Sequence, residues 1–397
     1  MIKKLYSVLA ILLVVAMLLS ACQTPATTAP TEEVVEVVEP TATTAPVVEE
    51  PTAEPAVVFK ACQVTDTGGI DDKSFNATAW KGFQDAAAAY GVEVKYLESM
   101  AQTDYEKNIN AFIQEKCDLI VSVGFLLADA TKAAAEANPD QKFAIIDQTY
   151  DPAIPNVRSS AFAVDQSGFL NGYLAASQTK TGKVGTYGGI QFPAVTAFMD
   201  GFYAGVQHYN QIKGTAVEVL GWDPTTQTGL FAGNFDSTDD GRRLGESLLD
   251  EGADIIMPVA GPVGEGTLAV LKERGTGMLV GVDTDWAVKY PDSADFILSS
   301  VLKNMDVFVT ETVGKALDGT FQGENYLGTL ENGGVGIGIS SAWTDKIAAE
   351  TVAELDQLEN DIVSGKLSPA PIKVTAPEGF KACQVTDTGG IDDKSFN

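Results

Sequence analysis

The fold of this chain is decided by the stretch Val64-Thr65-Asp66-Thr67-Gly68-Gly69-Ile70-Asp71-Asp72-Lys73-Ser74-Phe75-Asn76. An apolar run leads into it, and two glycines with a cluster of aspartates then break that run. Beyond it, Ala79, Phe83 and Ala86 recur at spacings of four and three residues, which predicts one face of a helix. The stretch is therefore predicted to be a turn between a strand and a helix. In an open parallel sheet, ligands bind outside the carboxyl ends of the strands, where this turn would lie.

The same alternation of strand and helix patterns continues along the chain. Strands are predicted at 57–65, 92–97, 118–123, 142–147, 157–162, 183–187, 216–220, 254–259, 278–283 and 295–300. Helical patterns lie between most of them, which indicates parallel sheets with helices on both faces. The units form two groups, one ending near 162 and one near 290. We therefore predict an α/β fold of two similar lobes with a ligand cleft between them.

Length and composition agree with two lobes. The chain has 397 residues, which is long for one ordinary domain, and 45% of them are hydrophobic, which is enough to form two cores. The net charge is −28. Such a chain repels the phosphates of nucleic acids and anionic lipid headgroups, so neither is an expected partner.

The first segment of the chain has the pattern of a secretory signal. Residues 1–22 begin with two lysines, continue through an apolar run and end in Leu19-Ser20-Ala21-Cys22. This ending resembles the bacterial lipoprotein signal, which implies lipidation of Cys22 and a lipid anchor on the outer side of the cell membrane; the alternative is an ordinary signal peptide. Residues 23–58 contain seven glutamates and no lysine or arginine, with many prolines, and are predicted to be a disordered tether.

The other cysteines leave two alternatives open. Cys62 lies in the first predicted strand and Cys117 precedes the strand at 118–123, and these strands are neighbours in a sheet of order 2-1-3. The two residues form either a disulfide or two buried free thiols. Residues 380–397 repeat residues 59–76 letter for letter. A strand without its covering helix buries little surface, so we predict a loosely attached tail there.

Catalytic patterns are weak. The single histidine, His208, is expected to be a surface or capping residue, and the sequence has no nucleophile elbow or paired Cys/His metal spacing. The glycine-rich runs 261–266 and 333–336 lack the Lys-Ser or Lys-Thr of a phosphate loop. We therefore predict no enzyme activity, no metal and no cofactor.

One enzymatic alternative is kept. Gly69-Ile70-Asp71-Asp72 is similar to the calcium loop of nucleoside hydrolases, but Thr65 and Thr67 occupy the positions of its first two aspartates. The loop therefore lacks two of the expected oxygen ligands for calcium.

Binding residues are indicated more clearly. Asp66, Asp147 and Asp283 each end an apolar strand, and Phe75 follows the first turn. Such aspartates can cap helices or form turns, but three at equivalent places favour a ligand site. Carboxylates accept hydrogen bonds from sugar hydroxyls or ring N–H groups, and an aromatic ring stacks on a flat ligand.

The opening stretch resembles the first motif of the basic membrane protein family, the substrate-binding lipoproteins of ABC importers that include purine nucleoside receptors. The likeness covers roughly 59 to 320. It continues in order through Val123-Gly124-Phe125, Ile145-Ile146-Asp147, Phe169-Leu170-x-Gly172-Tyr173-Leu174-Ala175-Ala176, Phe198-x-x-Gly201-Phe202, Gly233-Asn234-Phe235-Asp236, Gly252-Ala253-Asp254, Ala260-Gly261-x-x-Gly264 and Gly281-Val282-Asp283-x-Asp285.

The resemblance implies a two-lobed type I periplasmic-binding-protein fold with three crossovers. The first lobe is expected at 59–162 plus 295–322, and the second at 163–294 plus 323–379. The implied site residues have these roles: Phe75 and Phe235 sandwich the base, Asp147 binds the base edge, Asp66, Asp283 and Lys303 hold the ribose hydroxyls, Asn76 assists, and Gly261 allows close backbone approach.

The sequence departs from the family pattern at two tryptophans. Trp286 stands where glutamine is frequent, and Trp222 lies in an inserted segment, 221–229. Either ring is a candidate for stacking on a different ligand, and Trp222, Phe198 and Phe231 compete with Phe235.

The sequence thus predicts an extracytoplasmic, monomeric receptor of an ABC importer. It is expected to close its lobes on a nucleoside, with a purine preferred, and to pass it to a membrane permease. The alternatives are a calcium-dependent nucleoside hydrolase and a ligand-sensing lipoprotein for a sugar or another small polar metabolite.

Overall fold

The computed structural model describes residues 58–369 of the chain. The signal peptide with Cys22, almost all of the tether and the repeat at 380–397 lie outside the described residues. The lipid anchor, the disordered tether and the loosely attached tail therefore stay predictions. Within the described part, no helix is both long and apolar enough to cross a membrane.

Two six-stranded sheets form the centre of the structure, as the α/β prediction required. The first has the order β13-β5-β4-β3-β1-β2, made by β1 (Lys60–Val64), β2 (Glu93–Leu97), β3 (Leu119–Val123), β4 (Lys142–Ile146), β5 (Val157–Phe162) and β13 (Asn325–Gly328). The second has the order β14-β12-β11-β10-β6-β7, made by β6 (Lys183–Gly188), β7 (Glu218–Leu220), β10 (Ile255–Val259), β11 (Met278–Asp283), β12 (Ile297–Lys303) and β14 (Val335–Ile339). All neighbours pair in parallel except β14, which is antiparallel to β12. The predicted fold class is confirmed.

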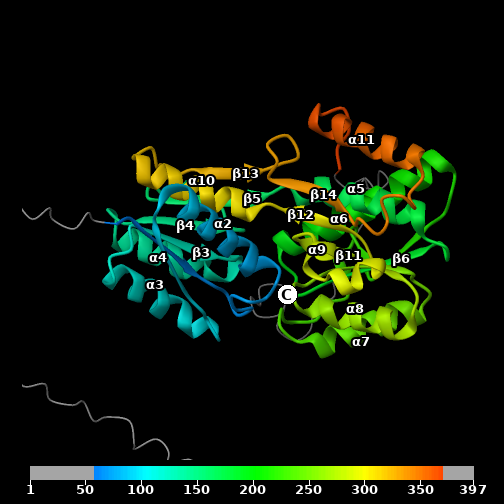
Figure 1. Cartoon of the computed structure of the whole chain (residues 1–397), viewed down its shortest axis with the longest axis horizontal. Helices are drawn as coiled ribbons and strands as arrows, with labels where there is room; N and C mark the ends of the chain where they lie inside the picture. The colour runs from blue at the N-terminus through cyan, green and yellow to red at the C-terminus, as the bar shows by residue number, and fades with distance from the viewer. Residues whose placement is uncertain (1–57, 370–397) are drawn as a thin grey trace, which may run out of the picture. The chain divides into compact units, whose positions relative to one another are not determined.

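Helices cover both faces of each sheet (Figure 1). The first sheet carries α2 (Phe75–Tyr90), α3 (Tyr105–Gln114), α4 (Ala128–Ala137) and α10 (Met305–Asp318). The second carries α5 (Val164–Gln178), α6 (Pro193–Lys213), α7 (Thr238–Asp250), α8 (Val263–Arg274), the short α9 (Trp286–Lys289) and α11 (Ala349–Val363). Shorter pieces are the 3₁₀ turns η1 (Gln102–Asp104), η2 (Phe125–Leu127) and η3 (Pro291–Phe296) and the hairpin of β8 (Trp222–Asp223) and β9 (Thr228–Gly229). Each sheet with its helices is called a lobe below.

Alternation along the strands separates the core into layers. On β3, Leu119 and Val121 share a cluster with Phe83 of α2, whereas Ile120 belongs to another cluster with Ile109 of α3. Successive strand residues point to opposite faces of a sheet, so one apolar strand supplies both layers. This explains why the predicted strands show continuous apolar runs.

The chain passes between the lobes three times, after β5, after β12 and between β13 and β14. The predicted boundaries at 295 and 323 are wrong in detail. The strand at 297–303 pairs with β11 and β14 of the second sheet, and the strand at 325–328 pairs with β5 of the first. The second crossover therefore lies at Asn304. An apolar pattern identifies a strand, but the sheet that it joins depends on which core it fills.

Glycines bring α5 and α6 into backbone contact. Gly168 and Gly172 are spaced by four residues on α5, as Gly201 and Gly205 are on α6, so each pair lies on one helix face. A Cβ added to Gly172 would lie 2.0 Å from the carbonyl oxygen of Phe202. Glycine is required here by the close approach of the two helices.

The alternatives for two of the cysteines are resolved. Cys62 in β1 and Cys117, just before β3, form a disulfide with their Cα atoms 6.2 Å apart. Strand β1 lies between β2 and β3, the predicted order of these three strands. The bond crosses from one strand to its neighbour within a buried cluster.

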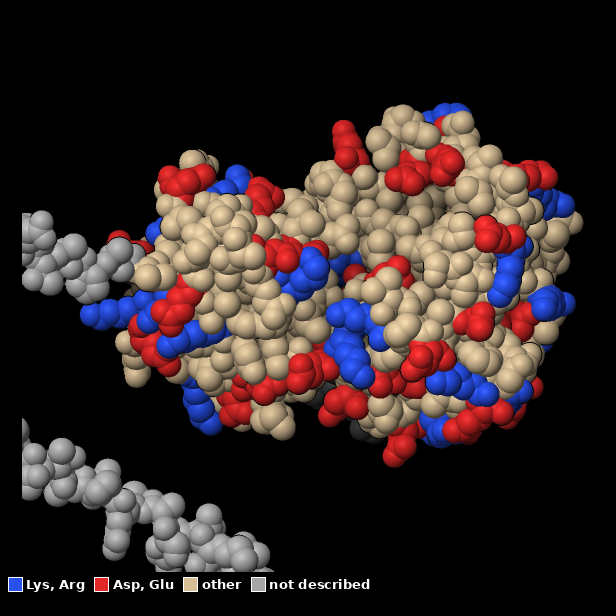
Figure 2. Space-filling view, viewed as in Figure 1, with Lys and Arg blue, Asp and Glu red and all other residues tan. Residues whose placement is uncertain are grey.

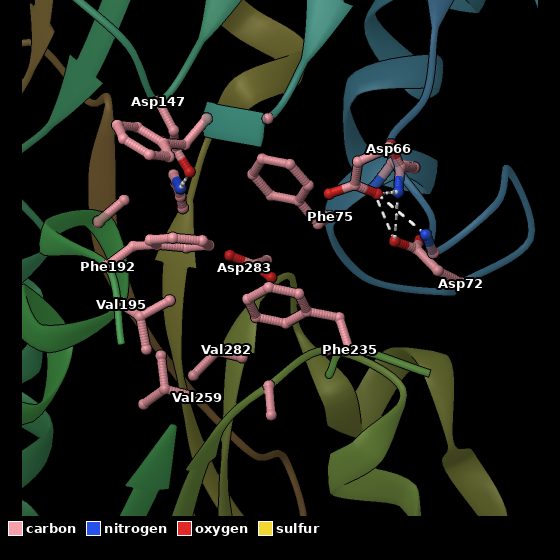
Figure 3. Close-up of a pocket in the computed structure, with 18 of the residues that line it drawn as sticks. Asp66, Asp72, Phe75, Asp147, Phe192, Val195, Phe235, Val259, Val282 and Asp283 are labelled. Carbon is pink, nitrogen blue, oxygen red and sulfur yellow. Dashed lines mark hydrogen bonds and ion pairs between the residues drawn. The ribbon is translucent and has the colours of Figure 1, made fainter. Parts of the chain in front are cut away.

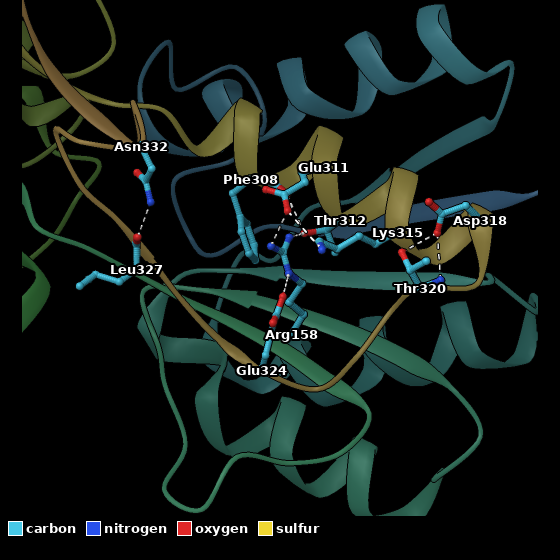
Figure 4. A network of polar contacts seen from close by, with 10 residues as sticks. All are labelled: Arg158, Phe308, Glu311, Thr312, Lys315, Asp318, Thr320, Glu324, Leu327 and Asn332. Atoms are coloured by element: carbon cyan, nitrogen blue, oxygen red, sulfur yellow. Dashed lines mark hydrogen bonds and ion pairs between the residues drawn. The ribbon is translucent and has the colours of Figure 1, made fainter.

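A buried arginine ties together the segments of the first lobe that adjoin the crossovers (Figure 4). Arg158 on β5 donates hydrogen bonds to Glu311 and Thr312 on α10 and to Glu324 just before β13, at 3.0, 2.6 and 2.9 Å. Its guanidinium also lies 4.9 Å from the ring centroid of Phe308. These contacts hold the ends of the crossover segments in a fixed arrangement on the first sheet.

The surface carries charges of both signs. Figure 2 shows Asp and Glu side chains distributed over this face of both lobes, with Lys and Arg between them. Since acidic residues outnumber basic ones by 54 to 26 in the whole sequence, polyanions are disfavoured as partners.

Candidate functional site

A cavity lies between the two lobes, at the carboxyl ends of strands from both sheets (Figure 3). All of the residues that the sequence analysis assigned to a ligand line it: Asp66, Phe75, Asn76, Asp147, Phe235, Gly261, Asp283 and Lys303. The structure therefore brings these residues together, and their individual roles toward a ligand stay predictions.

The turn before α2 is organised by Asp72. Its carboxylate accepts hydrogen bonds from the backbone N–H groups of Ser74, Asn76 and Ala77 at 2.9, 2.8 and 2.9 Å. These are orphan donors at the start of a helix, which a carboxylate satisfies well. Asn76 in turn donates from its side-chain nitrogen to Asp66 at 2.7 Å. Sequence reasoning missed this role of Asp72, although an acidic residue just before a helix is a recognisable signal.

Burial changes the acidity of these carboxyl groups. Desolvation raises the pKa of Asp66, and it raises the pKa of Asp72 to about 7 although backbone hydrogen bonds oppose the shift. Desolvation also raises the pKa of Asp283, while the charge of Lys303 and a hydrogen bond from Ser74 lower it. Several acidic groups already repel one another in this site. An anionic ligand is therefore disfavoured, because its negative charge would add to that repulsion.

Asp147 and Asp283 occupy equivalent places in the two sheets. Each lies at the end of a strand with the same position in the strand order, β4 in one sheet and β11 in the other. Both have left-handed backbone conformations, with φ of 67° and 68°. Such angles are uncommon outside glycine and cluster at functional sites. Asp66 follows β1 of the first sheet and is not part of this equivalence.

Lys303 pairs with Asp147 across the lobes. Its Nζ lies 2.5 Å from Asp147 Oδ2, and the two side chains are only 3% and 10% exposed. The ammonium also lies 4.8 Å from the ring centroid of Phe75. The cation that the sequence analysis assigned to ribose is therefore neutralised by the aspartate that it assigned to the base edge.

Phenylalanines form much of the apolar wall. Phe75 begins α2 and Phe235 lies on the loop before α7, and both rings border the cavity (Figure 3). Phe125 and Phe192 also line it, and their ring centroids are 5.0 Å apart across the two lobes. Sequence reasoning assigned no role to these two. Phe125 stands in a quoted motif, whereas Phe192 had no local signal.

The aromatic residues that compete with Phe235 for the stacking role differ in where they lie. Phe198 lines the cavity. Trp222 is 4% exposed, donates from Nε1 to Asp200 at 2.9 Å and packs against Phe231. Trp286 is 1% exposed and donates from Nε1 to the carbonyl of Val282 at 3.0 Å. The expectation that these tryptophans provide a stacking surface is wrong, because both indoles are used in the core of the second lobe.

Gly261 lies in the cavity wall, and its predicted role of allowing close approach of a ligand to the backbone stays a prediction. Its φ is 54°, and a Cβ built on it would meet nothing within 4 Å. The left-handed backbone strains any other residue, and the missing side chain leaves space in the cavity wall.

The hydrolase alternative finds no support in this geometry. Within residues 58–369, no group of three or more acidic, histidine or cysteine side chains could hold a metal ion. Thr65, at one of the positions where that loop needs an aspartate, donates its hydroxyl to the carbonyl of Asp66 at 2.8 Å. His208 is partly buried in α6 and is not a free surface residue. Its ring centroid lies 5.2 Å from that of Phe169, and burial lowers its pKa.

Two mostly parallel sheets joined by three crossovers, with a cavity between their strand ends, form the architecture of a two-lobed ligand-binding protein. Residues 59–370 match the family described as ABC transporter substrate-binding protein, PnrA-like, and the chain belongs to this family. Proteins of this family bind a small molecule and work with a membrane permease.

Known relatives agree with this assignment. The chain is 32% identical over 329 residues to an ABC transporter nucleoside-binding protein, BmpA, of Lactococcus lactis, covering 78% of this chain and 88% of the relative. It is also 32% identical over 328 residues to a CD4+ T-cell-stimulating antigen of Listeria monocytogenes, covering 78% and 87%. A solved ABC transporter solute-binding protein of Aeropyrum pernix superposes with a TM-score of 0.69 at 25% identity, covering 78% and 92%.

Proposed function

We propose that this protein captures a nucleoside, with a purine preferred, and delivers it to an ABC permease. The observation that carries the proposal is the composition of the cavity wall. Aromatic side chains border it, carboxylates come from both sheets, and Lys303, the single lysine or arginine in the described lining, is neutralised by Asp147. A flat ring with neutral hydroxyls suits this wall, whereas a phosphate would be repelled.

Each residue then has a task within the proposal. Phe75 and Phe235 stack on the base, and Asp147 accepts from N–H groups on the base edge. Asp66 and Asp283 accept from ribose hydroxyls, and Asn76 keeps Asp66 oriented through their 2.7 Å hydrogen bond. Charge-assisted hydrogen bonds in a closed site are stronger than neutral ones, so the hydroxyls provide much of the specificity.

Phe75→Ala and Asp283→Ala should each weaken nucleoside binding without unfolding the protein. Loss of stacking costs about 0.5–1.5 kcal/mol beyond the lost area, and loss of a hydrogen bond to a charged group about 1.5–3 kcal/mol. If the two sites act independently, the combined loss is roughly a few hundredfold in affinity. Calorimetry with adenosine, guanosine, inosine, uridine and ribose measures the effects. A 2′-deoxynucleoside should be penalised less in Asp283→Ala than in the wild type, because one of the two proposed acceptors of ribose hydroxyls is already gone.

Asp236→Ala is the matched control, because Asp236 is exposed beside Phe235 and lies outside the cavity lining. Its affinity should equal that of the wild type. If the wild type binds none of these nucleosides at millimolar concentration, the ligand assignment fails while the family assignment stands. Release of free base during incubation would point to the hydrolase alternative instead.

We also propose that Cys22 carries the lipid that holds the protein on the outer face of the cell membrane. The support is the sequence Leu19-Ser20-Ala21-Cys22 at the end of the signal. Cys22→Ala should move the protein from the membrane fraction to the soluble fraction, as followed by immunoblotting. Retention of the variant in the membrane fraction would contradict the anchor.

A further inference from the structure

A hydrogen bond of Ser74 joins the two lobes inside the cavity region, in addition to the pair of Lys303 with Asp147. The hydroxyl of Ser74 donates to Oδ2 of Asp283 at 2.8 Å, between residues that are 209 positions apart. Ser74 belongs to the turn before α2 in the first lobe, and Asp283 ends β11 in the second. They are 1% and 7% exposed, so the bond is shielded from water.

Ser74 is held firmly on its own side. Its backbone N–H donates to Asp72 at 2.9 Å, and its carbonyl accepts from the backbone N–H of Thr78 at 2.9 Å. These contacts leave the side-chain hydroxyl as the group that Ser74 presents to the other lobe. A donor with a fixed position can fix the orientation of the carboxylate that it meets.

Asp283 has one oxygen in this bond and lines the cavity. A carboxylate can accept at both oxygens, so Oδ1 is available for a hydroxyl of a ligand. The charged groups that act on Asp283 are Lys303, which favours its ionised form, and Asp147 and Asp66, which disfavour it.

We propose that Ser74 is a positioning residue of the ligand site: it orients the ionised Asp283 carboxylate and holds the two lobes closed over a bound ligand. The ligand part of this inference rests on the proposed function. Because the bond spans the lobes, it must break when they separate, so its loss should mainly accelerate release of the ligand.

The acidity of Asp283 provides a readout that a merely structural role would not move. Burial raises its pKa, and the hydrogen bond from Ser74 lowers it. Removing the hydroxyl should therefore raise this pKa further. Since hydroxyl binding needs the ionised carboxylate, affinity falls as the pH drops through the pKa, and in Ser74→Ala this fall should begin at a higher pH.

The binding test compares the wild type, Ser74→Ala and the matched control Ser122→Ala. Ser122 is a buried serine of the first lobe whose hydroxyl accepts from Thr131 at 2.7 Å, away from the cavity lining. For Ser74→Ala, we expect about tenfold weaker nucleoside binding, which corresponds to the loss of one hydrogen bond to a charged group. Most of this loss should appear as faster dissociation of the nucleoside, measured by stopped flow. Ser122→Ala should keep the wild-type dissociation rate and pH profile.

A double-mutant cycle tests the mechanism. On an Asp283→Asn background, Ser74→Ala should have a clearly smaller effect, because the charged acceptor is already gone. An effect of equal size on both backgrounds would overturn the proposal, as would a wild-type dissociation rate and pH profile in Ser74→Ala.

A ligand-free measurement separates this inference from the proposed function. Small-angle X-ray scattering without ligand should show a larger average radius of gyration for Ser74→Ala than for the wild type and Ser122→Ala, because one contact between closed lobes is lost. Identical scattering of all three proteins would reject the closing role of Ser74. If the wild type binds no nucleoside but the scattering difference is present, the proposed ligand fails and the closing role stands.

Discussion

Gly172→Ala is expected to lower the free energy of unfolding by about 3 kcal/mol, the upper range for overpacking a core. The added methyl would lie 2.0 Å from the carbonyl oxygen of Phe202, which is far inside contact distance, and the obstacle is backbone that cannot rotate away. Helices α5 and α6 would have to separate. Their buried residues contribute to the main core cluster, so the separation would loosen the second lobe as a whole.

Gly314→Ala is the control for this prediction. Gly314 is also a helical glycine, on α10, but a Cβ there would meet the hydroxyl end of Tyr90 at 3.1 Å, and Tyr90 is 45% exposed. The side chain can move, and alanine has the higher helix propensity, so the variant should be neutral or stabilised by up to about 1 kcal/mol. Urea unfolding of both variants decides the matter. Equal midpoints for the wild type and Gly172→Ala would show that the helices adjust without cost.

Local signals explain what the sequence could predict about the fold. The turn at 64–76 has an apolar strand before it, glycines within it and a helical pattern after it, and each of these is readable within a few residues. The glycines of α5 and α6 could be recognised only as parts of motifs, because their reason is the approach of another helix. The places of β12 and β13 depend on which core each strand fills, and no local pattern contains that information.

The binding site shows the same contrast between local sequence signals and contacts that depend on distant segments. Asp147 and Asp283 could be found because parallel strands end at one edge of a sheet, so residues at strand ends gather there. The pairing of Asp147 with Lys303 and of Asp283 with Ser74 could not be predicted, because the partners are 156 and 209 residues apart in the sequence. The family resemblance named Lys303 only as a ligand-binding residue. Those pairs form only when two lobes close on each other. Phe192 lines the cavity for the same reason, since its place depends on the approach of the first lobe.

Removing the disulfide between Cys62 and Cys117 is expected to have the other large effect. The bond joins residues separated by 55 positions. In the chain-entropy model, closing a loop of this length stabilises the folded state by about 4 kcal/mol, because the unfolded chain loses freedom. Both residues are buried in the smaller core cluster of the first lobe, so alanine is the appropriate replacement and serine would add an unpaired hydroxyl.

The comparison should be made in a background in which Cys22 and Cys383 are replaced by serine, because a third thiol could exchange with the bond. In this background, Cys62→Ala with Cys117→Ala should lower the melting temperature by roughly 10 °C. A reducing agent should lower the melting temperature of the protein that retains the disulfide by a similar amount and leave the double variant unchanged. If the double variant melts with its parent and reduction has no effect on either, then the pairing of β1 with β3 and the packing of α3 hold this side of the first lobe without the bond.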